Sequence, residues 1–298
     1  MNNPKIISVV GARPNFIKMK PIINSIKKNK INNILVHTGQ HYDQNMSEIF
    51  FKELMLPKPD YFMGIGSGTH TYQTAEIMIN FENICDNYSP DLVIVAGDVN
   101  STLACALVSA KKNIPVAHIE SGLRSFDRTM PEEINRIITD SISEILFVTE
   151  KSGVQNLIKE GIDRSKIHFV GNTMIDSLIN YIDQAKKRKP WLNYGLTPKN
   201  YCLVTMHRPS NVDDEIKMIS IIRLINQLSD KIKIIFPIHP RTAKLMKQCS
   251  ECLSENVIST SPLSYLDFLG LMSSSRFVLT DSGGIQEEST YLEVQCVT

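Results

Sequence analysis

The sequence predicts an α/β fold made of two doubly wound domains. Short apolar runs bounded by turn residues, typical of buried parallel strands, alternate with stretches of helical periodicity along the 298 residues. Alternation of this kind is the pattern of a parallel sheet covered by helices. It stops at a basic, proline-containing junction near 186–191 and then restarts. We therefore expect one domain over 1–180 and a second over 181–298.

Turn residues and apolar runs locate the elements of the first domain in order. The expected strands are 5–10, 34–38, 92–96, 116–119, 145–149 and 167–171. The first helix is capped by Asn15 and ends near Lys30. Further helices are expected at 45–54 and, after a Pro/Gly-rich loop, up to about Tyr88. One more helix is expected after each of the strands 92–96 and 116–119. The last two helices of this domain are expected at 150–160 and 172–187.

The second domain repeats the alternation. Its expected strands are 201–206, 233–238, 257–260 and 277–280, and helices are expected at 213–229 and from Ser264. The last residues, YLEVQCVT, end on what reads as another strand. This is short for a domain of this architecture, so we expect a truncated C-terminal domain.

Composition narrows the class of protein. The formal net charge is +1, which does not favour nucleic acid or an anionic membrane as a partner. No apolar run reaches the ~18 residues of a membrane span. The six cysteines are scattered through apolar surroundings, as in reduced cytoplasmic proteins. We therefore expect a cytoplasmic protein that binds neither nucleic acid nor membrane.

Three carboxylates follow predicted strands in the first domain. Asp98 follows the strand 92–96, Glu120 ends the strand 116–119, and Glu132 opens the next helix. Ligands of open parallel sheets bind beyond the carboxyl ends of the strands, so these groups are expected to share one crevice. They suit proton transfer. Mg²⁺ held with waters is the weaker alternative, because no His or Cys joins them at ligand spacing.

Two turns could bind phosphate. Gly11-Ala-Arg13-Pro14 opens a helix, with Lys18 one turn further, and Ser282-Gly283-Gly284 opens another. Helix N-termini favour anions, although a solvated arginine or a plain capped turn explains each motif alone. Glu288, one turn further along, could accept hydrogen bonds from ribose. The GxGxxG fingerprint is absent, so no dinucleotide is predicted.

Histidines end strands in the second domain. His207 and His239 each follow an expected strand, where a histidine acts as a general acid, a phosphate ligand or a structural group. Acidic groups in one domain and histidines with an anion site in the other would suit a nucleotide sugar in a cleft between the domains.

The order and content of these motifs resemble one enzyme family, the non-hydrolysing UDP-N-acetylglucosamine 2-epimerases. The matching segments cover nearly the whole chain: GARPNFIKMKP, HTGQHYDQNMS, VAGDVNSTLA, AHIESGLRS, MPEEINR, GNTMIDSL, VTMHRPSN, FPIHPRT and LTDSGGIQEE. The resemblance implies a GT-B-like fold of two Rossmann-like domains, and a homodimer. Two departures from the family pattern are found. Arg-Pro-Ser follows His207 in place of the commoner Arg-Arg or Arg-Glu-Asn, and the chain ends before the family's final segments.

The resemblance also implies an activity. The family removes the C2 proton of UDP-N-acetylglucosamine and eliminates UDP to give 2-acetamidoglucal. UDP and a proton then add back to give UDP-N-acetylmannosamine for cell-surface polysaccharides. No nicotinamide or other cofactor is needed.

The resemblance assigns roles residue by residue. The implied catalytic residues are Asp98, Glu120, Glu132 and His207. The implied substrate-binding residues are Arg13, Lys18, Arg136, Leu263, Phe268, Ser282, Gly283, Gly284 and Glu288.

Other activities stay open from the sequence. The chain could act on another UDP-2-acetamido sugar, such as a diacetamido uronic acid derivative. A hydrolysing epimerase that releases UDP is a further alternative. So is a truncated binding remnant without activity.

Overall fold

The computed structural model describes residues 3–40, 51, 53–206, 208–212, 214–238, 240–246 and 248–298. The chain forms two compact units, Met1–Ser177 and Leu178–Thr298. Among the described residues each unit contains one sheet, and every strand pairing in the two sheets is parallel. The expected fold class, α/β with two doubly wound sheets, is confirmed.

The N-terminal sheet has seven strands in the order β3-β2-β1-β4-β5-β6-β7. Their bounds are β1 Lys5–Val10, β2 Asn32–His37, β3 Tyr61–Phe62, β4 Leu92–Ala96, β5 Val116–Ser121, β6 Ile145–Val148 and β7 Ile167–Phe169. The central strands β1, β4 and β5 are buried along almost their whole length, as expected of mainly apolar strands that are covered on both faces.

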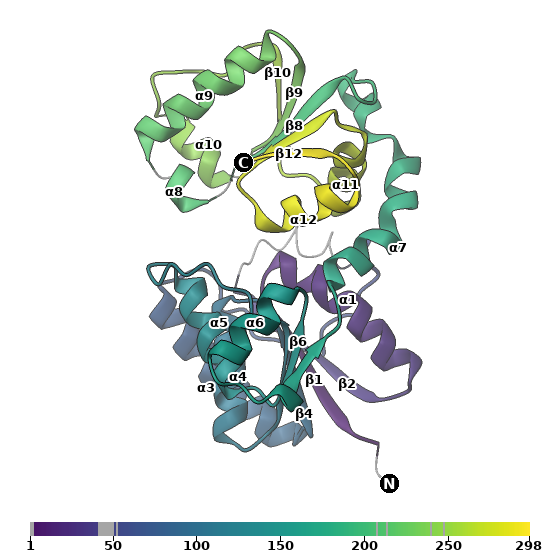
Figure 1. Ribbon diagram of the computed structural model, residues 1–298, viewed down its shortest axis with the longest axis vertical. Helices are drawn as coiled ribbons and strands as arrows, with labels where there is room; N and C mark the ends of the chain where they lie inside the picture. Colours follow the sequence, from purple (N-terminus) through teal and green to yellow (C-terminus); the bar gives the residue numbers. More distant parts are fainter. Residues whose placement is uncertain are drawn as a thin grey trace. The chain divides into compact units, whose positions relative to one another are not determined.

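Helices cover both faces of this sheet (Figure 1). Their bounds are α1 Arg13–Lys28, α3 His70–Tyr88, α4 Asn100–Lys111, α5 Pro131–Ile142, α6 Lys151–Lys159, the short η1 Arg164–Lys166 and α7 Thr173–Arg188, which crosses into the second unit. α3, α4 and α5 pack side by side on one face, and α1 lies against β1 and β2. Ile77 and Phe81 of α3 pack with Ile7 and Val93 of the sheet in one buried hydrophobic cluster.

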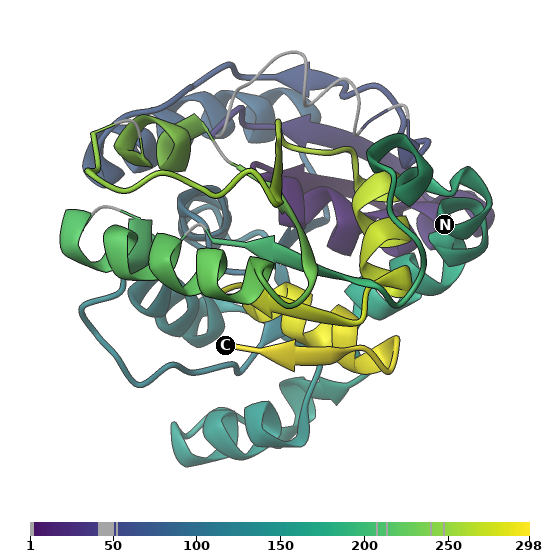
Figure 2. The ribbon, with the colours of Figure 1, turned by 90° about the horizontal axis from the view of Figure 1, so that it is seen from above.

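The C-terminal sheet has five strands in the order β10-β9-β8-β11-β12. The strands are β8 Tyr201–Thr205, β9 Lys233–Pro237, β10 Val257–Thr260, β11 Phe277–Thr280 and β12 Gln295–Val297, and β12 lies at the edge of the sheet (Figure 2). The helices are η2 Pro190–Tyr194, α8 Pro209–Val212, α9 Glu215–Ser229, α10 Pro240–Met246, α11 Tyr265–Ser274 and α12 Gly283–Tyr291.

The strand orders place one switch point in each unit. Order reverses between β1 and β4 in the first sheet and between β8 and β11 in the second. The loops that leave neighbouring strands there run in opposite directions, which opens a crevice at the carboxyl ends. Both sequence motifs that we expected to bind phosphate follow strands at these two points.

The structure differs from the sequence predictions in a few elements. The loop 57–70 contains the two-residue strand β3, which pairs with β2. Asn15 is not the N-cap of α1, because the helix begins at Arg13 and Ala12 occupies the cap. The polar side chain of Asn15 folds back onto the preceding turn instead. The helix expected at 45–54 falls largely outside the described residues.

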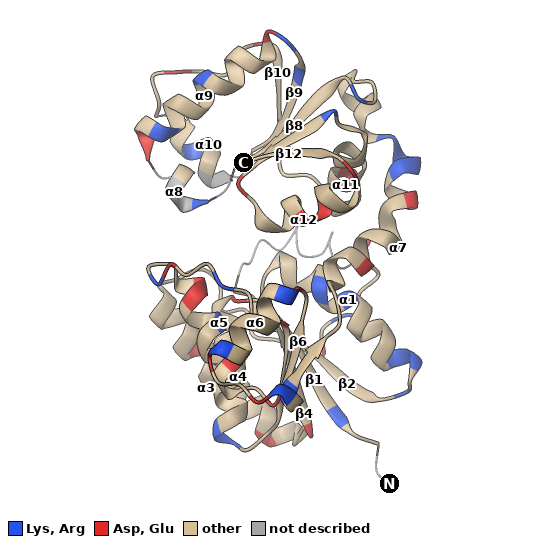
Figure 3. Cartoon of the chain, in the orientation of Figure 1, with Lys and Arg blue, Asp and Glu red and all other residues tan. Residues whose placement is uncertain are grey.

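Charges of both signs are spread over each unit (Figure 3). This agrees with the near-zero net charge of the sequence. Within the described part of the chain, no helix is both long enough and apolar enough to cross a bilayer.

Candidate active site

The turn after β1 is fastened to the neighbouring strand β4. Asn15 accepts hydrogen bonds from the backbone N–H groups of Gly11 (3.2 Å) and Ala12 (3.0 Å), and its Nδ2 donates to the carbonyl of Ala96 at 2.8 Å. A Cβ at Gly11 would lie 2.2 Å from the Ser101 hydroxyl, so only glycine fits. The first turn of α1 is thereby fixed beside the end of β4 at the switch point.

Two ion pairs lie at this edge of the sheet. Lys18 of α1 pairs with Glu120, and Arg136 of α5 pairs with Asp98. All four side chains are at most 28% exposed. A Cβ at Gly97 would lie 3.3 Å from Lys18 Nζ, so the two pairs adjoin. The structure therefore brings together four of the residues that we expected at the site.

Backbone geometry turns Glu120 out of its strand. The register between β5 and β6 shifts between Ile119 and Ser121, and Glu120 has a φ of +68°. A non-glycine residue in this left-handed region costs roughly 1–2 kcal/mol. Such strain is common at functional sites, and here it accompanies the ion pair with Lys18.

The loop 122–130 is held by Glu133, not by Glu132. The Glu133 carboxylate accepts the N–H groups of Ser125 (2.9 Å) and Phe126 (3.0 Å) and contacts Arg136 Nη1 at 3.1 Å. Burial alone would raise the pKa of Glu133, but these backbone donors and Arg136 lower it below its usual value. Glu132 lies in the same first turn of α5 and is partly exposed. No described side chain forms a hydrogen bond or ion pair with it.

The second switch point carries the glycine-rich turn. β11 ends at Thr280, whose hydroxyl lies 2.7 Å from that of Thr205 at the end of β8 and accepts the Ser282 N–H at 3.0 Å. α12 begins at Gly283, where an added Cβ would meet no atom within 4 Å. The start of α12 thus offers an open backbone surface to an anion.

Asp281 connects this turn to the segment that follows β8. Its Oδ2 accepts the Arg208 N–H at 2.9 Å and the Asn211 amide at 3.1 Å. His207 itself lies outside the described residues. For Arg13 the structure places the backbone, at the start of α1, and its side chain lies outside the description.

Glu288 is a buried carboxyl group one turn into α12. It is 3% exposed, and Tyr265 Oη donates a hydrogen bond to its Oε1 at 2.9 Å. Burial raises the pKa of Glu288 to about 7, against the lowering effect of that hydrogen bond. Leu263 and Phe268 are partly buried and flank the start of α11, which carries Tyr265. The residues expected around the nucleoside thus lie on two neighbouring segments of one unit.

Sequence reasoning missed several residues that organise these sites. Asn15 was expected to cap a helix, and neither Glu133 nor Tyr265 carried a functional prediction. The adjacent glutamates 132 and 133 give no sequence signal of which one turns inward. The Tyr265–Glu288 contact joins two helices and has no local signature.

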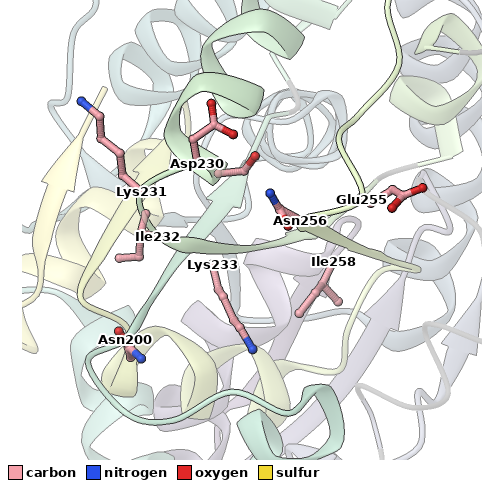
Figure 4. A pocket seen from close by; sticks show the side chains of 9 residues that line it. Asn200, Asp230, Lys231, Ile232, Lys233, Glu255, Asn256 and Ile258 are labelled. Atoms are coloured by element: carbon pink, nitrogen blue, oxygen red, sulfur yellow. The ribbon is translucent and has the colours of Figure 1, made fainter.

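A separate hollow lies at the opposite edge of the C-terminal sheet (Figure 4). Its volume is about 510 Å³, and it is lined by Asn200, Ser229, Asp230, Lys231, Ile232, Lys233, Glu255, Asn256 and Ile258. These residues precede β8, β9 and β10 or lie in the first two residues of β9 and β10, so the hollow lies at the amino ends of the strands. It is therefore remote from the glycine-rich turn.

Comparison with known proteins decides the family. The model of the UDP-N-acetylglucosamine 2-epimerase family matches residues 24–298. The UDP-N-acetylglucosamine 2-epimerase of Methanocaldococcus jannaschii is 44% identical over 304 residues, which covers 99% of this chain and 83% of the relative. The chain belongs to the UDP-N-acetylglucosamine 2-epimerase family.

A further relative and a solved structure are also similar to this 2-epimerase. The UDP-2,3-diacetamido-2,3-dideoxy-D-glucuronate 2-epimerase of Pseudomonas aeruginosa is 42% identical, covering 99% of this chain and 82% of the relative. A crystal structure of the M. jannaschii enzyme in complex with UDP-GlcNAc and UDP matches with a TM-score of 0.90 and 43% identity, over 98% of this chain and 83% of that one. The expected GT-B-like fold class agrees with this match.

Proposed function

We propose that this 2-epimerase interconverts UDP-N-acetylglucosamine and UDP-N-acetylmannosamine. The observation that carries the proposal is the pair of adjoining ion pairs, Lys18–Glu120 and Arg136–Asp98, at the switch point of the N-terminal sheet. Inversion at C2 requires proton transfer on both faces of the sugar, and two separately held carboxylates suit that task. The 44% identity to a UDP-N-acetylglucosamine 2-epimerase supports the same substrate.

The proposed reaction is an elimination followed by an addition. A carboxylate takes the C2 proton while the C1–O bond to UDP breaks and its electron pair leaves with UDP. The C2–H electron pair forms the C1=C2 double bond of 2-acetamidoglucal. In the second half, UDP attacks C1 again, and a proton is delivered to the opposite face of C2. Atoms and charge balance without an oxidant or reductant.

The acid–base roles are proposed for Asp98, Glu120 and Glu132, with His207 assisting the departure of UDP. One positioned acid or base contributes about 10²–10⁴-fold to a rate. No carbonyl adjoins C2 on the ring, so much of the remaining barrier must be lowered by stabilising the leaving UDP. Arg13 and Lys18 are proposed to share in that stabilisation as substrate-binding cations.

The UDP group is proposed to bind the C-terminal unit. Ser282, Gly283 and Gly284 offer the start of α12 to the diphosphate, and Gly283 has open space where a phosphate oxygen would approach. Glu288 is proposed to contact the ribose, with Leu263 and Phe268 beside the uracil. Arg136 is proposed to act within the sugar site through its pair with Asp98.

The setting of the enzyme is also proposed. A homodimer is proposed on the family resemblance, and the exposed Tyr72 (53%) and Ile79 (60%) of α3 are candidates for its interface. Sedimentation at several concentrations tests it. All six cysteines are free thiols, which supports a cytoplasmic location where nucleotide sugars feed polysaccharide synthesis.

The deciding experiment is incubation with UDP-N-acetylglucosamine in D₂O, followed by NMR at C2 and a measurement of free UDP. Deuterium at C2, a growing UDP-N-acetylmannosamine signal and little net UDP are the expected result. Net release of UDP would identify a hydrolysing enzyme instead. Absence of exchange with bound ligand would overturn the proposed activity.

A second substrate deserves the same assay. The P. aeruginosa relative, 42% identical, acts by its name on UDP-2,3-diacetamido-2,3-dideoxy-D-glucuronate. Competition between this uronate and UDP-N-acetylglucosamine, compared as kcat/KM ratios, decides which sugar the enzyme prefers.

A further inference from the structure

His118 and Asp140 form a fully buried pair beneath the candidate acid–base groups. His118 of β5 is 0% exposed and Asp140 of α5 is 1% exposed. His118 Nδ1 lies 2.6 Å from Asp140 Oδ1, and Nε2 lies 2.7 Å from the carbonyl oxygen of Gly97. Neither residue is assigned a role in the proposed reaction.

The contacts determine how many protons the imidazole carries. A carbonyl oxygen can only accept, so Nε2 must donate to Gly97. Asp140 accepts the Gly122 N–H at 3.0 Å and contacts Arg124 Nη2 at 2.8 Å through its Oδ2, as an ionised carboxylate does. Burial alone would raise the pKa of Asp140, but His118 and Arg124 lower it below its usual value. Nδ1 must therefore donate as well, which makes His118 an imidazolium.

Charged groups around this pair balance the imidazolium. The side chain of Arg124 is 1% exposed and pairs with both Asp140 and Glu160. Glu160 contacts Arg124 Nε at 2.8 Å and lies toward the surface at 37% exposure. Two cations thus face two carboxylates, so the buried charge of His118 has partners.

The pair joins the three elements that carry the acidic residues. Gly97 directly precedes Asp98 at the end of β4, His118 stands two residues before Glu120 in β5, and Asp140 belongs to the helix that carries Glu132. The next carbonyl, that of Asp98, is held by Asn135 of the same helix at 2.8 Å. Two consecutive carbonyls after β4 are therefore fixed by side chains.

The same pair stabilises unusual backbone. Gly97 has a φ of +69° and Glu120 a φ of +68°. Glycine adopts this conformation freely, whereas a non-glycine residue such as Glu120 persists there only where its surroundings hold it. His118 holds the Gly97 carbonyl after β4, and Asp140 holds the Gly122 N–H two residues after Glu120.

We propose that His118 is a positioning residue of the active site, a doubly protonated imidazole that sets the direction of Asp98 through the Gly97 carbonyl. The proposal rests on the proposed function for its effect on catalysis. Its statement about the proton count of the ring does not depend on activity.

The first test is the ¹⁵N NMR spectrum of the histidine rings in the full chain. His118 is assigned by comparison with a His118→Gln sample. Both His118 nitrogens are expected as N–H in the wild type, because each of them faces an acceptor oxygen. Asp140→Asn should leave one, because the amide turns its oxygen toward Gly122 and its NH₂ toward Nδ1. One bare nitrogen in the wild type would overturn the proposal.

The second test compares two substitutions of the ring. His118→Gln places an amide nitrogen near the position of Nε2 and keeps the contact with Gly97, whereas His118→Asn places it near Nδ1 and loses that contact. Misplacement of a reacting group by about 1 Å costs on the order of 10²-fold, so kcat of the Asn variant should fall by about that factor with KM little changed. The Gln variant should recover most of the loss.

Glu160→Gln is the matched control. It removes a charge from the same network through Arg124 without touching the ring, and it should leave kcat near the wild-type value. Equal kcat in the Gln and Asn variants, at equal melting temperatures, would assign His118 a merely structural role. A wild-type enzyme that fails to epimerise but shows two N–H signals would overturn the proposed function and leave the ring chemistry standing.

Discussion

Glu288 should make the stability of the C-terminal unit depend on pH, and its replacement by glutamine should remove that dependence. Burial raises the pKa of Glu288 from 4.5 to about 7 in the folded protein. Below pH 4.5 the carboxyl group is protonated in both states. As pH rises from 4.5 toward 7, the carboxyl group ionises in the unfolded chain but stays protonated in the folded protein, so the free energy of unfolding falls. Above pH 7 the group is ionised in both states, and the free energy of unfolding falls no further on its account.

The magnitude follows from the size of the shift. Each unit of pKa difference corresponds to about 1.4 kcal/mol, so a rise from 4.5 to about 7 corresponds to about 3 kcal/mol at high pH. Glutamine has the same shape and keeps an oxygen for the Tyr265 hydroxyl, but it does not ionise. Glu288→Gln should therefore be more stable than the wild type by about 3 kcal/mol at pH 8 and by much less at pH 5.

The chain provides its own probe for this measurement. Its single tryptophan, Trp191, is 9% exposed and lies in η2 of the C-terminal unit. Urea unfolding followed by Trp191 fluorescence at pH 5, 6, 7 and 8 thus reports on the unit that contains Glu288. Glu293→Gln, at an exposed position after the same helix, controls for the loss of one negative charge. A stability difference between Glu288→Gln and the wild type that is the same at every pH would refute the reasoning.

Further substitutions test the candidate site. Asp98→Asn should slow deuterium exchange at C2 by about 10²–10⁴-fold, since an amide cannot accept the proton, and unchanged exchange would remove Asp98 from the chemistry. Lys18→Met leaves the partly buried Glu120 carboxylate unpaired, so kcat/KM for UDP-N-acetylglucosamine should fall at least about tenfold. A thermal melt shows whether the variant still folds. Full activity of a folded variant would contradict the role of the Lys18–Glu120 pair. Gly11→Ala should cost about 1–3 kcal/mol in urea unfolding, because its Cβ has no room. Gly283→Ala should fold normally yet bind UDP more weakly by calorimetry, and unchanged affinity would argue against phosphate at that turn.

Much of the fold is readable from the sequence because the strands are buried on both faces. Runs such as 92–96 and 201–204 are apolar throughout, so their length and bounds are marked by the polar residues around them. The strand β3 cannot be predicted in this way. It has two residues, both exposed, and it exists because it pairs with β2 at the edge of the sheet.

The site is less readable because side-chain partners come from distant segments. Asp98 and Glu120 follow strands, and topology alone places strand ends at one edge. Their cations come from α1 and α5, however, and the pairing depends on how those helices are rotated. The same limit explains Asn15, a good N-cap by type that instead reaches the carbonyl of Ala96 on a strand 81 residues away. His118 gives no signal of its own, since its meaning depends on a buried carboxylate on another element.

The backbone at Glu120 carries a consequence for sequence evolution and design. A left-handed φ beside a register shift is a conformation in which glycine is the residue of lowest backbone energy. A procedure that optimised stability alone would favour glycine there and would erase a carboxylate. Under the acid–base role proposed for Glu120, this position gives up backbone stability in exchange for turnover.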